Sequence, residues 1–304
     1  MASAPPAGPH TTPQAPEERE LACGALHGTL ALPRGIDPTA AALIIPGSGS
    51  VDRNGDLPGL ASGFLRQLAH ELARQGVATL RIDKRGIGKS AGFAENELRF
   101  GQMVTDAVAW SVRLRAEVPA RPLLLIGHSE GALVATMAAR TAAVDGLVLL
   151  AGAGSPAHEV ILRQLDEAGL PLELRDHAQR IIGELLRGEP AADVPEALAP
   201  LFRDSVQPYL MSWLPLDPAA QLAQVTCPAL VVQGTTDLQV GVADAERLAA
   251  ARDGVRLVLV PAMNHVLKQA PSDRQANLAT YGDAQAPLAP ELVGTLAEFV
   301  ATVR

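Results

Sequence analysis

The sequence predicts an α/β protein with a mostly parallel central sheet, helices on both faces of the sheet, and an inserted helical cap. Three observations support this prediction. Short apolar runs bounded by Gly or Pro alternate with segments of helical periodicity along most of the chain, which is the element order of a parallel sheet with crossover helices. Residues 155–216 interrupt the alternation with short helical segments only. The 304 residues, 48% of them hydrophobic, suffice for one large core or two smaller ones.

The expected strands and helices follow in order from the N-terminus. The stretch LACGALHGTLALP, residues 21–33, predicts an antiparallel hairpin at one edge of the sheet. Short apolar runs predict strands buried on both faces at residues 41–47, 77–83, 122–127, 145–152, 228–234 and 255–261. Helices are predicted where apolar residues recur at helical spacing, namely Phe64, Leu65, Leu68 and Leu72, then Val104, Ala107, Val108 and Val112, and finally Leu292, Val293, Leu296, Phe299, Val300 and Val303.

Composition divides the chain into a start, a core and a cap. Residues 1–18 contain five prolines and almost no large apolar side chain, so we expect this segment to be flexible. Residues 19–154 and 217–304 form the expected core, and residues 155–216 form the expected helical cap. The apolar residues of the cap either cover a ligand crevice at the carboxyl edge of the sheet or, for most of them, only pack the cap onto the core; they include Leu162, Ile181, Leu185, Phe202, Tyr209, Met211 and Trp213.

Charge and cysteine content argue against several classes of function. The net charge of −8 is spread without long runs of one sign, so the sequence predicts no nucleic-acid face and no membrane-surface patch. Cys23 and Cys227 lie in no metal-ligand spacing, so we expect two small buried side chains and neither a disulfide framework nor a structural zinc. The chain has no signal-peptide pattern and no run of roughly 18 apolar residues, so we expect a cytoplasmic protein.

One serine stands where a strand is expected to turn into a helix. The stretch LLLIGHSEGALVA, residues 123–135, places Ser129 between Gly127 and Gly131. A sharp strand-to-helix turn imposes strained backbone angles on the residue at its apex, and flanking glycines leave room for that residue. The hydroxyl then lies at the carboxyl edge of the sheet, near the N-H groups of a helix beginning at about Glu130. The short pattern Gly-x-Ser-x-Gly indicates a nucleophilic serine only where a strand precedes it and a helix follows it, as expected here. The alternative is a serine in an ordinary turn.

A serine hydroxyl is a weak nucleophile at neutral pH, so it needs a base and an orienting acid. Asp237 follows one late strand and His265 follows the next, which gives the order Ser, Asp, His of a nucleophile-elbow enzyme. A turn or a helix N-cap is the alternative role for Asp237, and a neighbouring aspartate could then act instead. The other histidines fall in the flexible start, the hairpin, a helix, the elbow and the cap, as His10, His27, His70, His128, His158 and His177.

Two backbone N-H groups are expected to hold an oxyanion. In this arrangement one donor follows the nucleophile and the other lies in the loop after an early strand, which predicts the N-H groups of Glu130 and Ser48. Gly47 and Gly49 in that loop let the backbone approach a ligand closely, or serve only a tight turn. The loop has neither the Gly-Lys-Ser/Thr of a P-loop nor a complete Gly-x-Gly-x-x-Gly, so phosphate binding is not predicted.

At these residues the chain resembles the α/β-hydrolase superfamily, in particular bacterial serine esterases related to serine aminopeptidases. PGSGSVDRNG, RIDKRGIGKS, GHSEG, QGTTD and the final NH of PAMNH carry the resemblance, in this order across residues 40–304. The resemblance implies a nucleophile, acid and base at Ser129, Asp237 and His265. The chain departs from the family at Pro46-Gly47, where His-Gly is frequent.

Three charged residues near the expected site, Asp83, Arg85 and Arg53, are assigned no step of the chemistry. The resemblance implies that the loop containing Asp83 and Arg85 is structural and is fixed beside the site by an ion pair. Arg53 either binds a substrate carboxylate or, as the simpler interpretation, pairs with Asp52 or Asp56.

The predicted reaction is hydrolysis of a carboxylic ester with a small to medium acyl group. The serine attacks the carbonyl, the histidine moves the proton, and water releases the acyl group, so no metal and no cofactor is needed. The expected partner is a small-molecule ester, and the sequence favours no particular oligomeric state. A thioesterase, a peptidase and a non-catalytic ligand-binding protein of the same fold are the alternatives. A peptidase acting at amino termini would need an acidic group in the cap, for which the candidates are Glu159, Asp166, Glu167, Glu173 and Glu184, each more simply a surface charge.

Overall fold

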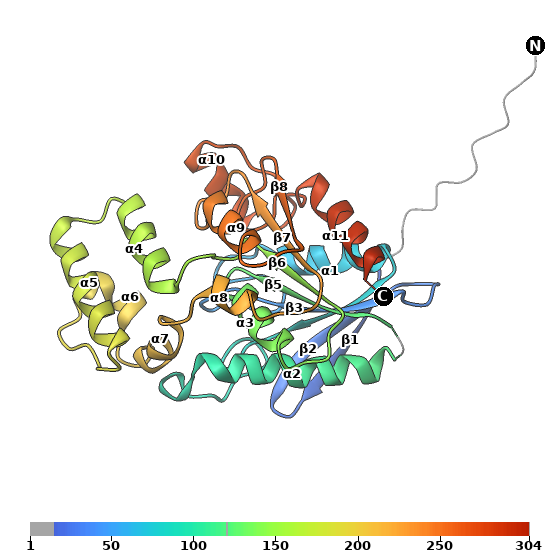
Figure 1. Ribbon diagram of the computed structural model, residues 1–304, viewed down its shortest axis with the longest axis horizontal. Helices are drawn as coiled ribbons and strands as arrows, with labels where there is room; N and C mark the ends of the chain where they lie inside the picture. Colours follow the sequence, from blue (N-terminus) through green and yellow to red (C-terminus); the bar gives the residue numbers. More distant parts are fainter. Residues whose placement is uncertain (1–14, 120, 304) are drawn as a thin grey trace, which may run out of the picture.

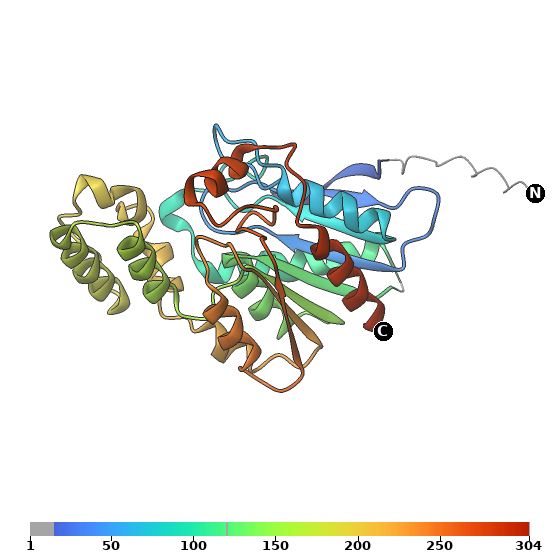
Figure 2. The ribbon, with the colours of Figure 1, turned by 90° about the horizontal axis from the view of Figure 1, so that it is seen from above.

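An eight-stranded sheet forms the centre of the computed structural model, which describes residues 15–119 and 121–303. The strand order is β1-β2-β4-β3-β5-β6-β7-β8; the β1–β2 and β2–β4 pairs are antiparallel and the other pairs are parallel. Helices cover both faces of the sheet (Figure 1, Figure 2), so the predicted α/β fold with a mostly parallel sheet is confirmed. The strands are β1 (Glu17–Cys23), β2 (Leu26–Leu32), β3 (Ala40–Ile45), β4 (Val77–Ile82), β5 (Leu123–His128), β6 (Gly146–Leu150), β7 (Ala229–Gly234) and β8 (Val255–Val260).

The hairpin at the first edge of the sheet begins earlier than the sequence suggested. Residues 1–14 of the segment expected to be flexible lie outside the described residues, but β1 starts at Glu17, which pairs with Leu32. The boundary at residue 18 is therefore corrected by two residues. An edge strand forms backbone hydrogen bonds along one side only, so it can carry charged side chains. Glu18 of this strand forms an ion pair with Arg81. A pattern of apolar residues does not show such a strand.

Each face of the sheet packs against its own helices. Leu68 and Leu296 join one apolar cluster with the inner strands, and Trp110 and Val134 join another on the opposite face. The prediction that residues 255–261 are buried on both faces is wrong, because the helices cover this last strand only in part and leave side chains along it exposed. The covering helices are α1 (Phe64–Arg74) and α11 (Pro290–Thr302) on one face, and α2 (Phe100–Glu117), α3 (Glu130–Ala139), α8 (Pro218–Leu222) and α9 (Val242–Ala249) on the other.

The core-facing side of helix α2 is shifted from the predicted one. Ala107 is buried, and Val104 and Val108 pack against the core as expected, but Val112 is 68% exposed. Phe100, Trp110 and Leu114 are fully buried in its place. Burying an aromatic ring removes more apolar surface from water than burying a valine, so the larger side chains decide how the helix is rotated.

The interval without strands forms a group of helices that stands apart from the sheet at the carboxyl ends of its strands (Figure 1, Figure 2). Its residues share an apolar cluster of their own, which includes Ile181, Phe202 and Leu214. Tyr209 and Trp213 join this region to the core, because both rings pack near Phe100 of α2. The helices of this group, called the cap below, are α4 (Ala157–Glu167), α5 (Leu172–Leu186), the 3-10 turn η2 (Glu196–Leu198), α6 (Ala199–Phe202) and α7 (Gln207–Trp213). Outside the cap lie the 3-10 turns η1 (Glu95–Glu97) and η3 (Thr280–Gly282) and the helix α10 (Arg274–Ala279) after β8.

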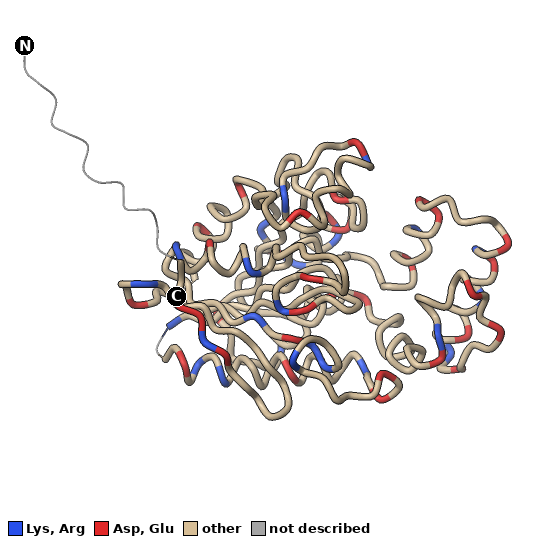
Figure 3. The backbone as a smooth tube through the Cα atoms, turned by 180° about the vertical axis from the view of Figure 1, so that it is seen from behind, with Lys and Arg blue, Asp and Glu red and all other residues tan. Residues whose placement is uncertain are grey.

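Acidic and basic residues are interspersed over the core and the cap (Figure 3). Within the described residues, no helix is both long and apolar enough to span a membrane. Cys23 and Cys227 are free thiols, and both are only partly buried, which corrects the expectation that they are buried side chains. Each packs at the margin of the core rather than inside it.

Candidate active site

Ser129 occupies a strained turn between β5 and α3. Its backbone angles are φ 54° and ψ −122°, a backbone conformation that residues other than glycine rarely adopt. A Cβ at Gly127 would lie 2.1 Å from the carbonyl oxygen of Gly131, and a Cβ at Gly131 would lie 2.4 Å from that of Ile45. Positions 127 and 131 must therefore be glycine for β5, α3 and β3 to approach one another this closely. The N-H of Ser129 donates to the carbonyl of Leu150 at 2.9 Å, which ties the turn to β6.

His265 and Asp237 form a buried pair beyond the ends of β8 and β7. Nδ1 of His265 lies 2.9 Å from Oδ2 of Asp237. The carboxylate also accepts hydrogen bonds from the N-H groups of Gln239 and Val240 and from the amide of Gln233. Burial acts to raise the pKa of Asp237, but the charge and hydrogen bond of His265 and the two N-H groups outweigh it and lower the pKa. The aspartate is therefore charged, and Nδ1-H donates to it, so Nε2 is free to accept a proton.

The structure brings Ser129 and His265 to one cavity. Both residues line a space of about 150 Å³ together with Ser48. Ser129 and Ser48 also line a second space of about 370 Å³ beneath the cap, which Glu130 lines as well. The predicted nucleophile Ser129 and the donor residue Ser48 thus line both cavities, while the predicted base His265 lines the smaller one and Glu130 the larger one.

His128, the residue before Ser129, binds the backbone of the loop that carries His265. Its Nε2 lies 2.7 Å from the backbone carbonyl of His265, and its ring is 4.9 Å from the His265 ring and 4.8 Å from that of Phe64, between centroids. Burial, with the neighbouring charge of His265, lowers the pKa of His128 to about 3. The ring is therefore neutral, and because a carbonyl can only accept, Nε2 carries the proton and donates it. Sequence analysis placed His128 in the elbow without a function.

The loop after β3 presents one of the predicted oxyanion donors. Within the described residues, the N-H groups of Ser48 and Glu130 have no hydrogen-bond partner, so both are free to bind a ligand. A Cβ at Gly47 would lie 3.0 Å from Cβ of Ser129, which shows how closely the loop approaches the serine. Nζ of Lys84 donates to the carbonyls of Gly47 and Gly49. Since the C=O and N-H of one peptide unit point in opposite directions, Lys84 turns the N-H of Ser48 away from itself. Sequence analysis missed Lys84.

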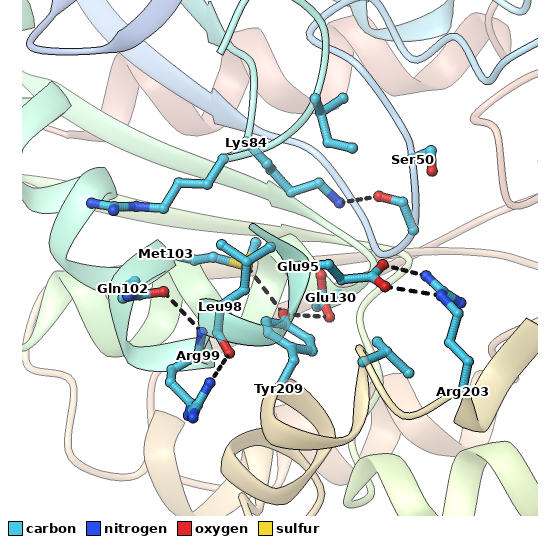
Figure 4. A pocket seen from close by; sticks show the side chains of 14 residues that line it. Ser50, Lys84, Glu95, Leu98, Arg99, Gln102, Met103, Glu130, Arg203 and Tyr209 are labelled. Atoms are coloured by element: carbon cyan, nitrogen blue, oxygen red, sulfur yellow. Dashed lines mark hydrogen bonds and ion pairs between the residues drawn. The ribbon is translucent and has the colours of Figure 1, made fainter. Parts of the chain in front are cut away.

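A buried polar contact joins the elbow to the cap (Figure 4). The hydroxyl of Tyr209, on α7, donates to the carboxylate of Glu130 at 2.8 Å and also touches the sulfur of Met103. Burial raises the pKa of Glu130, although the charge of Lys84 partly opposes this, and burial also raises the pKa of Tyr209. The side chain of the residue that follows the nucleophile is therefore held by the cap, while its N-H group has no hydrogen-bond partner within the described residues. Tyr209 had been counted only among the apolar residues of the cap.

The ion pairs beside the site differ from those expected. Arg53 is 5% exposed and pairs with Asp83 at 2.7 Å and with Glu20 at 3.0 Å, not with either neighbouring aspartate. It lines neither cavity at Ser129, so it does not reach a substrate there. Arg85 pairs with Asp106 of α2 at 2.6 Å. The loop is held by ion pairs as the family resemblance implied, but through two separate pairs whose partners lie far apart in the sequence.

Three comparisons with known proteins support the α/β-hydrolase fold. A family model described as serine aminopeptidase, S33, matches residues 59–192. The curated Esterase EstD of Thermotoga maritima is 24% identical over 264 residues, which are 85% of this chain. The match spans 62% of the length of EstD.

Solved structures share the fold over nearly the whole chain. Est1E from Butyrivibrio proteoclasticus, in its complex with ferulic acid, gives a TM-score of 0.61 at 17% identity and covers 93% of this chain and 99% of its own. A proline iminopeptidase from Mycobacterium smegmatis gives a TM-score of 0.59 at 14% identity, with 94% and 98% covered. At these identities the likeness establishes the fold alone.

Proposed function

Since the chain belongs to the α/β-hydrolase superfamily, we propose that it is a serine hydrolase that cleaves carboxylic esters of small to medium acyl groups. One observation carries the proposal. A buried His265–Asp237 pair opens on the same cavity as the strained Ser129. A strained turn that must be glycine at positions 127 and 131, together with a buried carboxylate hydrogen-bonded to an imidazole, is costly for a protein that only binds a ligand.

The reaction follows from the positions of these groups. Nε2 of His265 takes the proton of Ser129 as the serine oxygen attacks the ester carbonyl, and Asp237 stabilises the imidazolium that forms. The N-H groups of Ser48 and Glu130 bind the oxyanion of the tetrahedral intermediate. His265 then gives the proton to the leaving alcohol. Water, activated by the same histidine, releases the acid and restores the serine.

The larger cavity supports an apolar acyl group. The cap supplies much of its wall, and the core supplies Leu133 from α3. At about 370 Å³ it has the size of a small-ligand pocket and holds more than an acetyl group. The apolar cap residues that line it are Val160, Ile161, Leu201, Val206, Leu210 and Trp213.

The cap acids do not favour a peptidase. None of the five candidates lines either cavity at Ser129. Asp166 and Glu184 pair with arginines of the cap, and Glu159 lies 3.8 Å from Arg247. The acidic residue that does line the larger cavity is Glu130, whose carboxyl group is held by the Tyr209 hydroxyl and whose pKa is raised by burial, so its charged form is disfavoured and it is a poor partner for a substrate ammonium. The name of the curated relative Esterase EstD also supports the ester over the peptide bond.

A substrate panel tests the proposal. Ethyl esters from acetate to decanoate, matching acyl-CoA thioesters and aminoacyl anilides are compared by kcat/KM, with ester cleavage followed by proton release. We expect the ethyl esters to be the best substrates, with an optimum at a medium acyl length, and Ser129→Ala to be inactive on all of them. Faster cleavage of anilides would show a peptidase, faster cleavage of thioesters would show a thioesterase, and a wild-type protein inactive on every class would contradict a hydrolase.

A further inference from the structure

We propose that Asp244 and Arg247 of α9 clamp the cap onto the core through both of its connections, and that this clamp limits the length of acyl chain that fits beneath the cap. The proposal rests on the proposed function and adds two residues that determine its specificity without touching the substrate. The cap stands on two connections, which are residues 151–156 between β6 and α4 and residues 214–217 between α7 and α8 (Figure 1, Figure 2).

Asp244, in the first turn of α9, binds the first connection and the helix that follows it. Its Oδ1 accepts hydrogen bonds from the N-H groups of Gly154 at 3.0 Å and Ser155 at 3.1 Å, and its Oδ2 pairs with Arg163 of α4. The side chain of Asp244 is 2% exposed, so these partners replace the hydration that its charge has lost. A Cβ at Gly154 would lie 2.2 Å from the backbone carbonyl oxygen of Asp244. The first connection therefore lies directly against α9.

Arg247 follows three residues later on the same side of α9 and joins the two connections. Its Nη1 donates to the hydroxyl of Ser155 at 2.9 Å, and its Nη2 donates to the carboxylate of Asp217 at 2.7 Å. Asp217 is itself fixed, because its side chain caps the N-terminus of α8. One guanidinium group thus holds the segment that enters the cap and the segment that leaves it.

The clamp fixes one wall of the larger cavity. Val160 and Ile161 of α4 line that cavity, so the position of α4 sets its width. The cap has an apolar cluster of its own, and such a unit turns as one body about its connections when nothing else holds them. The contact of Tyr209 with Glu130 holds α7. Loosening the clamp should therefore move α4 away from the cavity and make room for a longer acyl chain.

Acyl-length profiles of two variants test the proposal. Asp244→Asn keeps the shape of the side chain but removes the charge that pairs with Arg163, and Arg247→Met removes the bridge between the connections. With ethyl esters from acetate to decanoate, we expect kcat/KM for decanoate relative to butanoate to rise about tenfold in each variant, the scale on which a pocket discriminates between acyl groups. The acetate ester should be cleaved at the wild-type rate, because its acyl group is too short to reach α4.

Two control variants remove similar ion pairs far from the cap. Asp145→Asn changes a carboxylate that also accepts a backbone N-H and pairs with an arginine, but at the amino ends of the strands. Arg256→Met removes an exposed pair with Glu298. Both controls should keep the wild-type acyl profile. Arg247 is 40% exposed, so Arg247→Met tests the clamp even where Asp244→Asn fails to fold.

Amide hydrogen exchange over residues 151–167 measures the clamp without any substrate. Exchange should be faster in both α9 variants than in the wild type and the controls, because the first connection and α4 open more often. An unchanged acyl profile or unchanged exchange in Arg247→Met would overturn the proposal, as would an equal shift of the profile in the controls. Inactivity of the wild type on every ester would refute the proposed function, whereas faster exchange in the α9 variants would still support the clamp.

Discussion

Lys84 and His128 each bind a backbone carbonyl in a segment that carries a proposed catalytic group. Lys84 holds the carbonyls of Gly47 and Gly49, and His128 holds that of His265. Neither needs to touch the reacting atoms, because each orients a group that does. At the residue scale, these are positioning residues whose removal should affect the transition state more than substrate binding.

Lys84→Met tests the first of them. Without the ammonium group, the peptide that carries the N-H of Ser48 loses its fixed orientation, so the oxyanion is less well stabilised. We expect kcat on ethyl butanoate to fall by about 10- to 100-fold, somewhat less than for the loss of a donor itself, with KM little changed. Lys89→Met is the matched control, because Lys89 lies in the same loop after β4 as Lys84 but its side chain is exposed. This variant should keep wild-type kinetics. Equal kcat values for the two variants would contradict the role of Lys84.

His128→Gln tests the second through the pH dependence of stability. The folded-state pKa of about 3 lies below the unfolded value of about 6.5, so below pH 6.5 the unfolded chain binds a proton at this position that the folded chain does not. This contribution to stability is present above the unfolded pKa and is lost as pH falls, by about 2 kcal/mol at pH 5. Glutamine keeps the donor to His265 and does not titrate.

The measurement is urea unfolding of both proteins at pH 7 and pH 5. The loss in free energy of unfolding between these pH values should be smaller for His128→Gln than for the wild type by about 2 kcal/mol. The same loss in both proteins would show that His128 does not resist protonation in the folded state.

Sequence reasoning identified candidate residues through local patterns and missed the residues that support them. Ser129, Asp237 and His265 each follow an apolar run, and their order along the chain is itself a signal. The contacts of Lys84 with Gly47 and of His128 with His265 span 37 and 137 positions, respectively. No local pattern encodes such contacts, because they depend on how the loops pack after the sheet has formed.

The elbow is the element on which the site depends most. The strand β5, the turn at Ser129 and the helix α3 approach so closely that Gly127 and Gly131 each face a backbone atom rather than a flexible side chain. A side chain at either position would force the helix away from the sheet, since backbone atoms cannot yield as a rotamer can.

Gly127→Ala should therefore lower the free energy of unfolding by about 3 kcal/mol or more. Gly101→Ala is the matched control, because this helical glycine in α2 has no atom within 4 Å of an added Cβ. It should raise stability by about 0.5–1 kcal/mol. Urea unfolding midpoints measure both changes. A Gly127→Ala protein as stable as Gly101→Ala would show that the turn is less closely packed than described.

The positions of the elements were predictable from apolar periodicity, and their orientations were not. The runs that became β3 to β7 are largely apolar, since helices cover both faces of a parallel sheet. The exposure of Val112 and of parts of β8 reflects competition between neighbouring side chains and the limited reach of the covering helices. These effects arise only when the elements pack against one another.

At the scale of the whole molecule, the cap is joined to the core by polar contacts beside the site. Tyr209 reaches Glu130, and Arg203 pairs with Glu95 of η1. The interruption of strand runs predicted a cap, but the cavity beneath it and the smaller cavity on the other side of Ser129 depend on turns and side chains that sequence patterns do not place. The expected substrate is therefore argued from the residues that line the cavities at Ser129, because the fold alone does not determine it.

The central claim is that His265 activates Ser129, and the rate at which a fluorophosphonate labels Ser129 measures this most directly, because the reagent needs no knowledge of the substrate. The wild type should be labelled at Ser129, and His265→Ala should be labelled at least about 1,000-fold more slowly, since the serine would have no base. Equal labelling rates in the two proteins, or label at another residue, would contradict the account.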